Sequence, residues 1–106
     1  MATAATLRRV DVNLHDLELE VDDLPDLAEA WDTLSDSNQV SYFLEWDDLM
    51  DRLDFLEKAH LASDMTPAQE KRYKALLVQL KKHEPLIKRL ELSRPKIAKW
   101  DKEATS

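Results

Sequence analysis

The chain has 106 residues, 43% of them hydrophobic, and a formal net charge of −7 at pH 7. This balance fits one small acidic domain with its own core better than a disordered chain or a multidomain enzyme. The chain has no cysteine, which excludes disulfides and thiolate chemistry, and no glycine, which excludes glycine-dependent phosphate-binding loops. Because tight β-hairpins also rely on glycine, we expect residues 1–106 to form a single all-α, or nearly all-α, domain.

The sequence also bears on where the protein works. No apolar run approaches the roughly 18 residues of a membrane span. The first residues lack the charged and then apolar order of a signal peptide. We therefore expect a cytoplasmic protein without a membrane partner.

The first predicted element is an acidic arm over residues 1–22. Apolar residues in the segment 10–21 alternate as in strands, but a subset of them also fits helical steps, so the period leaves both structures open. A hairpin turn at His15 and Asp16 would lack favourable turn residues, while valine, aspartate and asparagine are poor helix formers. We expect an extended or short-strand arm that pairs with a partner.

A helical bundle is predicted over residues 23–94, and it starts with a short helix. The segment 25–34 has apolar residues at helical spacing, and Pro25 suits the first turn of a helix. The charged remainder of the chain, residues 95–106, is predicted to be a basic C-terminal tail, because Arg94-Pro95 is expected to end the preceding helix.

Two longer helices, over about residues 38–62 and 67–92, are predicted to form an antiparallel hairpin. Short polar residues before the first helix, and Thr66-Pro67 before the second, are typical helix starts. Pro85 is expected to kink the second helix. The apolar stripes predicted to meet along the hairpin contain Tyr42, Trp46, Leu49, Leu53, Leu56 and His60, and Tyr73, Leu76, Leu80, His83, Ile87 and Leu90.

Two motifs in the sequence resemble parts of the metal sites of enzymes. Glu57 and His60 have the Glu-x-x-His spacing of helical di-iron sites, but such sites need a second copy and two further carboxylates. Glu45 and Asp48 resemble half of the magnesium motif of all-α nucleotide pyrophosphohydrolases, which need a second acidic motif on the facing helix. We therefore predict no catalytic, cofactor or metal site, with a small metal-dependent or nucleotide-handling enzyme as the alternative.

Charge is divided unevenly along the chain. Residues 1–65 hold 17 acidic and 4 basic side chains, whereas residues 66–106 hold 5 acidic and 11 basic ones. The basic half, with Trp100 as a stacking residue, suggests nucleic-acid binding as a second alternative. The acidic first half and the sequence pI near 4.9 oppose it. The uneven distribution is also explained if the acidic and basic halves of the chain attract each other.

The function expected from the sequence is a small, non-catalytic protein–protein interaction module. Antitoxin-like or immunity-like neutralisers and accessory subunits are examples of this class. Apolar residues outside the hairpin stripes indicate a protein partner and a homodimer. The acids among the apolar residues of the arm indicate that the partner is basic. The residues predicted to bind the partner are Val10, Val12, Leu14, Leu17, Leu19, Val21, Leu44 and Phe55.

Overall fold

The structure is a computed structural model that describes residues 2–97 and 100. Its elements are α1 (Ala4–Ala30), the 3₁₀ turn η1 (Trp31–Thr33), α2 (Asp36–Leu61), α3 (Pro67–Lys82) and α4 (Glu84–Arg89). No strand occurs in this part of the chain, so the predicted all-α class is confirmed. None of these helices is long and apolar enough to cross a membrane.

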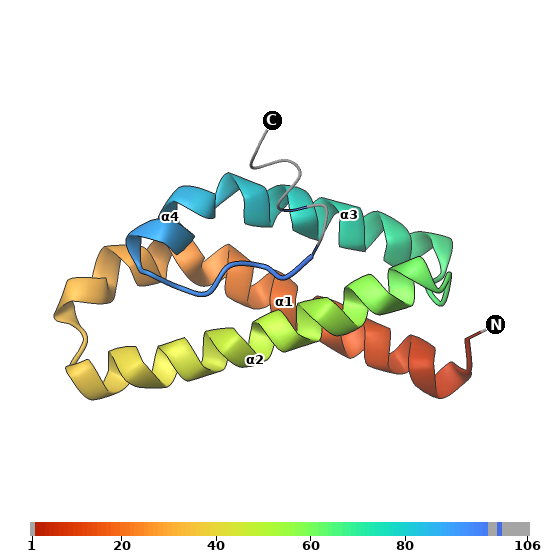
Figure 1. The fold of residues 1–106 in the computed structure, drawn as a ribbon, viewed down its shortest axis with the longest axis horizontal. Helices are drawn as coiled ribbons and strands as arrows, with labels where there is room; N and C mark the ends of the chain where they lie inside the picture. Colours follow the sequence, from red (N-terminus) through yellow and green to blue (C-terminus); the bar gives the residue numbers. More distant parts are fainter. Residues whose placement is uncertain (1, 98–99, 101–106) are drawn as a thin grey trace.

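The long helix α1 is the base on which the other helices pack. Its backbone lies close to both α3 and α2, whereas α2 and α3 approach each other less. In Figure 1, α2 and α3 run in opposite directions and diverge from the turn that joins them, and α1 crosses behind α2. The segment after α4 returns between α2 and α3, where the Trp46 indole N–H donates a 2.7 Å hydrogen bond to the Ser93 carbonyl.

The predicted extended arm is wrong, because residues 10–21 lie within α1. The helical period decides the structure, since apolar side chains at steps of three and four are buried against two other helices. That burial outweighs the poor helix propensity of valine, asparagine and aspartate, which is less than about 1 kcal/mol per residue. The buried stripe of α1 consists of Val10, Leu14, Leu17, Val21, Leu24 and Ala28.

Polar contacts from α3 also hold the N-terminal half of α1. The buried Gln69 side chain donates hydrogen bonds to the Leu7 carbonyl at 2.9 Å and to Asp11 at 2.8 Å. Arg72 forms a 2.6 Å ion pair with Glu18. Two acids of the predicted docking arm, Asp11 and Glu18, therefore have partners within the chain itself.

The predicted short helix over residues 25–34 is not a separate element. Helix α1 continues through Pro25, and only residues 31–33 form the turn η1. A proline inside a helix removes one backbone hydrogen bond and costs about 3 kcal/mol. Leu24 and Ala28 are buried on either side of it, so packing against the core holds the helix together there.

The boundaries predicted for the later helices are close to those observed. Thr66 caps α3 through a reciprocal pair of hydrogen bonds with Gln69. The predicted kink near Pro85 is confirmed as a break at His83, which separates α3 from α4. The missing amide hydrogen of Pro85 suits the first turn of the new helix.

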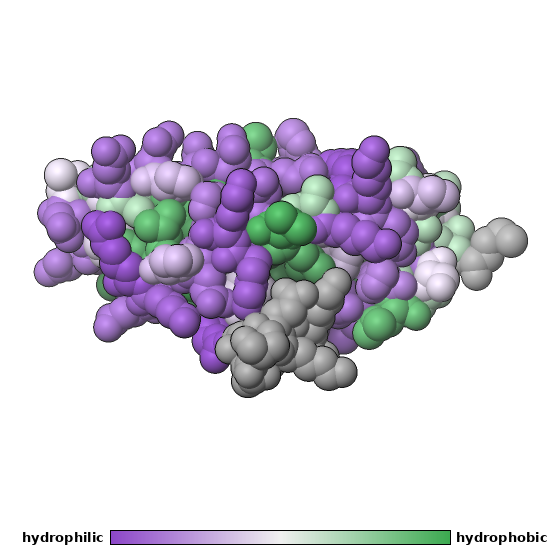
Figure 2. All heavy atoms as spheres, turned by 90° about the horizontal axis from the view of Figure 1, so that it is seen from above, coloured by the Kyte–Doolittle hydropathy of each residue, from purple (hydrophilic) through white to green (hydrophobic). Residues whose placement is uncertain are grey.

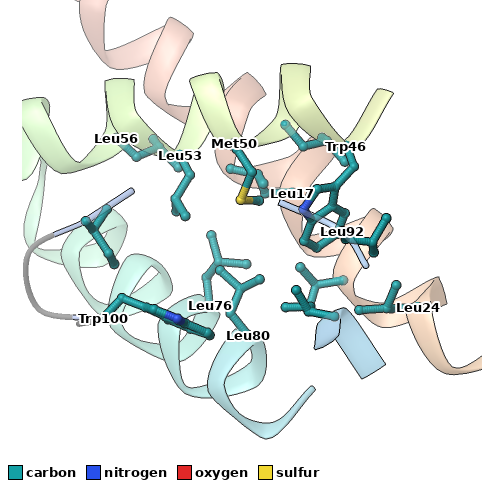
Figure 3. Packing of buried hydrophobic residues seen from close by; sticks show 14 of the residues in the cluster. Leu17, Leu24, Trp46, Met50, Leu53, Leu56, Leu76, Leu80, Leu92 and Trp100 are labelled. Atoms are coloured by element: carbon teal, nitrogen blue, oxygen red, sulfur yellow. The ribbon is translucent and has the colours of Figure 1, made fainter. Parts of the chain in front are cut away.

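The prediction that α2 and α3 pack directly on each other along their whole length is wrong. Side chains from both stripes enter one core, but α1 and the segment after α4 contribute to that core between them (Figure 3). The sequence did not predict that α1 is long enough to contact both α2 and α3. The predicted stripe residues that are buried are Trp46, Leu49, Leu53, Leu56, Tyr73, Leu76, Leu80, Ile87 and Leu90.

The start of the predicted basic tail packs on the core where the structure describes it. Pro95, Ile97 and Trp100 are buried. The Lys81 ammonium lies 4.5 Å from the centre of the Trp100 ring. These apolar side chains hold the segment against the core. The lysines around them in the sequence obscured this apolar pattern. The remainder of that prediction falls on residues 98–99 and 101–106, outside the described residues.

Candidate functional site

A groove of about 560 Å³ opens between α1 and α2, and all its lining residues come from these two helices. Smaller hollows continue it along the same pair of helices in both directions. We call this hollowed face the acidic groove. Its acidic residues are Asp16, Glu20, Asp23 and Asp26 on α1 and Glu45, Asp48 and Asp51 on α2.

The spacing of these acids explains their position. The α1 acids follow one another by four, three and three residues, and the α2 acids by three. Residues three or four apart lie on one side of a helix, so each helix carries a row of carboxylates. Each row borders the buried stripe of its own helix, and the contact between α1 and α2 therefore brings the two rows together.

Large apolar side chains lie among these carboxylates. Leu19 and Leu44 line the main groove and are 55% and 67% exposed. Val12, 56% exposed, and the partly buried Phe55 line the hollow at one end. The Arg9 guanidinium lies 4.4 Å from the centre of the Phe55 ring. The groove thus combines exposed apolar anchors with negative charge.

Only part of the negative charge is neutralised by cations in the described part of the chain. Arg52 forms ion pairs with Asp16 at 2.7 Å and with Asp48 at 3.0 Å. The other groove acids form no ion pair with any cation in residues 2–97 or with residue 100. They are Glu20, Asp23, Asp26, Glu45 and Asp51.

The crowding of acids affects Glu20 most clearly. Burial, followed by the nearby carboxylates of Glu45, Asp23 and Asp16, raises the pKa of Glu20 above its usual value. A raised carboxyl pKa means that the folded protein opposes the ionised form. A cation placed in the groove would relieve this opposition.

The eight residues predicted to bind a partner separate into two groups. Four are core residues of α1 with 2% exposure or less, and they offer no surface to a partner: Val10, Leu14, Leu17 and Val21. The other four lie together along the acidic groove: Val12, Leu19, Leu44 and Phe55.

No pattern in the sequence alone associates the acids of α2 with those of α1. The acids of α1 are predicted to lie in an arm, and Glu45 and Asp48 of α2 are half of a magnesium motif in the sequence. Both rows have acids at helical spacing next to an apolar residue outside the buried stripe, as Glu20 follows Leu19 and Glu45 follows Leu44. That signal could have identified the two rows, but only the packing of α1 on α2 unites them.

A second polar cluster joins the end of α2 to the start of α3. His60 Nδ1 lies 2.6 Å from Glu70 Oε2, and the Tyr73 hydroxyl donates a 2.9 Å hydrogen bond to Glu57. Burial and this hydrogen bond raise the pKa of Tyr73, which keeps its phenol protonated. The part of the chain that the structure describes contains no group of three or more potential metal ligands. The Glu57 and His60 side chains instead connect two helices.

The basic side chains of α3 lie away from the acidic groove, which α3 does not line. Lys71, Lys74 and Lys82 are exposed. Figure 2, which looks onto the α3 side of the molecule, shows a largely hydrophilic face with small separate hydrophobic patches. Trp100 is 3% exposed, so its ring is not an open platform on which a base could stack.

Comparisons with protein-family models, with curated proteins and with solved structures gave no match to this chain. The functional argument therefore rests on the chemistry of the described surface. In the acidic groove, exposed leucines coincide with carboxylates that form no ion pair with a described cation.

Proposed function

We propose that this protein is a non-catalytic interaction module that binds a basic protein partner through the acidic groove. One observation carries the proposal: Leu19 and Leu44 are exposed in a groove whose flanking acids Glu20 and Glu45 form no ion pair with a described cation. A neutralising role of the antitoxin or immunity type, or that of an accessory subunit, fits this proposal.

The two components of the groove favour different aspects of binding. Burying an exposed leucine side chain at an interface contributes about 1.5–3 kcal/mol. Unneutralised carboxylates accelerate encounter with a cationic surface and select against anionic ones. Their negative potential therefore argues against a nucleic-acid ligand at this site. A basic protein with apolar residues among its cations satisfies both components.

The predicted homodimer stays a prediction, and the charges of the groove oppose one form of it. A symmetric dimer through this face would bring Glu20 and Glu45 of one copy towards the same residues of the other. Like charges across an interface are unfavourable, so salt would strengthen such a dimer. Salt would weaken a complex with a basic partner, and the two cases are distinguishable on that basis.

The variant Leu44→Ser tests the proposal. We expect it to change stability by less than about 0.5 kcal/mol, because the side chain is exposed, but to weaken partner binding about tenfold or more. The measurement quantifies, by mass spectrometry, the protein that the immobilised wild type retains from its native cell at low salt and releases at high salt.

Leu61→Ser is the matched control, since Leu61 lies at the end of the same helix, is 74% exposed and does not line the groove. The control should retain the partner at the wild-type level. Equal retention by the Leu44 variant, or an equal loss by the Leu61 variant, would contradict a binding site in the acidic groove.

A further inference from the structure

The shape of the acidic groove restricts the kind of segment that fits it. Its lining residues extend from Arg9 to Leu27 on α1 and from Tyr42 to Phe55 on α2. At a rise of about 1.5 Å per residue, the α1 stretch is about 27 Å long and the α2 stretch about 20 Å. The shorter α2 wall limits the length over which an occupant contacts both helices. The groove therefore matches a rod of about four helical turns, or about 14 residues.

The walls of the groove also restrict how the backbone amides and carbonyls of an occupant can form hydrogen bonds. Both walls are helices, whose backbone amides and carbonyls are already bonded within the helix. An extended peptide gains main-chain hydrogen bonds by adding to a sheet edge, and no strand occurs among residues 2–97 or at residue 100. A helix satisfies its own backbone groups and needs only side-chain contacts. The groove therefore favours a helical occupant.

The positions of the side chains specify the surface of that helix. Leu19 and Leu44 lie in the main hollow, and Val12 and Phe55 lie in the hollow at one end. An occupant would meet these anchors with apolar residues at steps of three and four along one face. Carboxylates border the anchors from both helices, so the occupant needs lysine or arginine on both sides of its apolar stripe.

We propose that the acidic groove binds an amphipathic basic helix of about four turns, whose apolar stripe packs on Leu19 and Leu44 between two rows of carboxylates. This inference rests on the proposed function and specifies the kind of partner. Charge complementarity carries it, because the acids of both walls that form no ion pair with a described cation face the same hollow.

A second copy of the chain offers a weaker match. The outer face of α3 carries Lys71, Lys74 and Lys82 around Val78, which is 62% exposed. This stripe is basic, but it has one strongly exposed apolar residue where the groove presents three, which are Val12, Leu19 and Leu44. Two copies also repel each other through a formal net charge of −7 each.

The test uses the full chain and three synthetic peptides of about 14 residues, each of the same lysine, leucine and alanine composition. The first peptide has its leucines at steps of three and four, the second at every second position, and the third dispersed. Calorimetry measures each affinity at salt concentrations of about 0.01 M and about 1 M, between which the Debye length falls from about 30 Å to about 3 Å. Circular dichroism measures the helix that forms on binding.

We expect the first peptide to become helical and to bind at least about tenfold more tightly than the others, with a marked loss of affinity at high salt. Leu44→Ser should weaken its binding about tenfold, and Leu61→Ser should not change it. If the second peptide binds equally well, the helical occupant is wrong while a basic partner for the groove remains. If no peptide binds in a salt-dependent way, or if the Leu61 variant loses as much affinity as the Leu44 variant, both proposals fail. If light scattering of the peptide-free chain at low salt gives a mass above the 12.3 kDa of one chain, a second copy is the occupant instead.

Discussion

Replacing Leu17 with alanine is expected to lower the free energy of unfolding by about 2–5 kcal/mol, as is usual for a large-to-small change in a core. Leu17 is fully buried in the middle of α1 and lies near Met50 and Trp46 of α2 (Figure 3). Urea denaturation followed by circular dichroism measures the loss. The result tests whether this segment is part of the core or an arm that serves only a partner.

Leu19→Ala provides the control, because it makes the same change two residues away at a side chain that is 55% exposed. Its effect should stay within about 0.5 kcal/mol. If Leu17→Ala also cost less than about 0.5 kcal/mol, Leu17 would not be in the core, and the packing of α1 described above would be wrong.

The second large effect is expected at Trp46. Trp46→Ala should cost about 3–5 kcal/mol, because the indole is fully buried and its N–H bonds the Ser93 carbonyl at 2.7 Å. Trp46→Phe keeps an aromatic ring but removes the donor, so it should cost less, with about 1 kcal/mol from the lost hydrogen bond. Thermal melts of both variants supply the measurement.

The phenylalanine variant tests how the segment after α4 is held. Ser93 also donates from its hydroxyl to Asp47 at 2.6 Å, so the segment has two hydrogen bonds to α2. Weakening one of them should make cleavage by a protease near Ser93 faster. Wild-type cleavage in Trp46→Phe would show that the indole hydrogen bond does not hold this segment on α2.

The sequence was sufficient to predict the helical class and the boundaries of the later helices. Local chemistry determines these features. Ser35 and Thr66 cap their helices with their own side chains, and Pro85 interrupts the helix whatever that helix packs against. Such signals depend on residues within one or two turns. They can therefore be read without knowledge of the tertiary contacts.

The structure of α1 could not be read in the same way. Val12 and Leu19 made the segment alternate like a strand, but they are the exposed apolar residues of the acidic groove. They add apolar positions outside the buried stripe and blur its helical period. The local pattern was ambiguous because one helix carries both a core face and a second apolar face.

The candidate site was only half visible in the sequence for a related reason. Four of the predicted partner-binding residues line the groove, but the carboxylates that give it charge come from two helices whose contact no local pattern specifies. Glu20 and Glu45 line the same hollow although they are far apart in sequence. Tertiary packing creates their proximity, and the raised pKa of Glu20 is its electrostatic consequence.

The most direct test of the acidic groove as a binding site is the variant Glu20→Gln, measured for both stability and binding. Burial and the neighbouring acids raise the pKa of Glu20, so ionisation of this group opposes folding as pH rises above its usual value of 4.5. At neutral pH, glutamine removes this cost, and the melting temperature should rise. Below the usual pKa, wild-type Glu20 is protonated as well, and the difference should disappear.

The same variant should bind the helical basic peptide a few-fold more weakly at low salt, because one partly exposed charge pair contributes about 0.2–1 kcal/mol. Glu29→Gln is the control, since it makes the same change on α1 at an exposed site outside the groove, and it should alter neither quantity. A protein that becomes more stable and binds less well is the result expected of a groove whose charge serves a partner. A Glu20→Gln variant with unchanged or lower stability and wild-type peptide affinity would contradict that role.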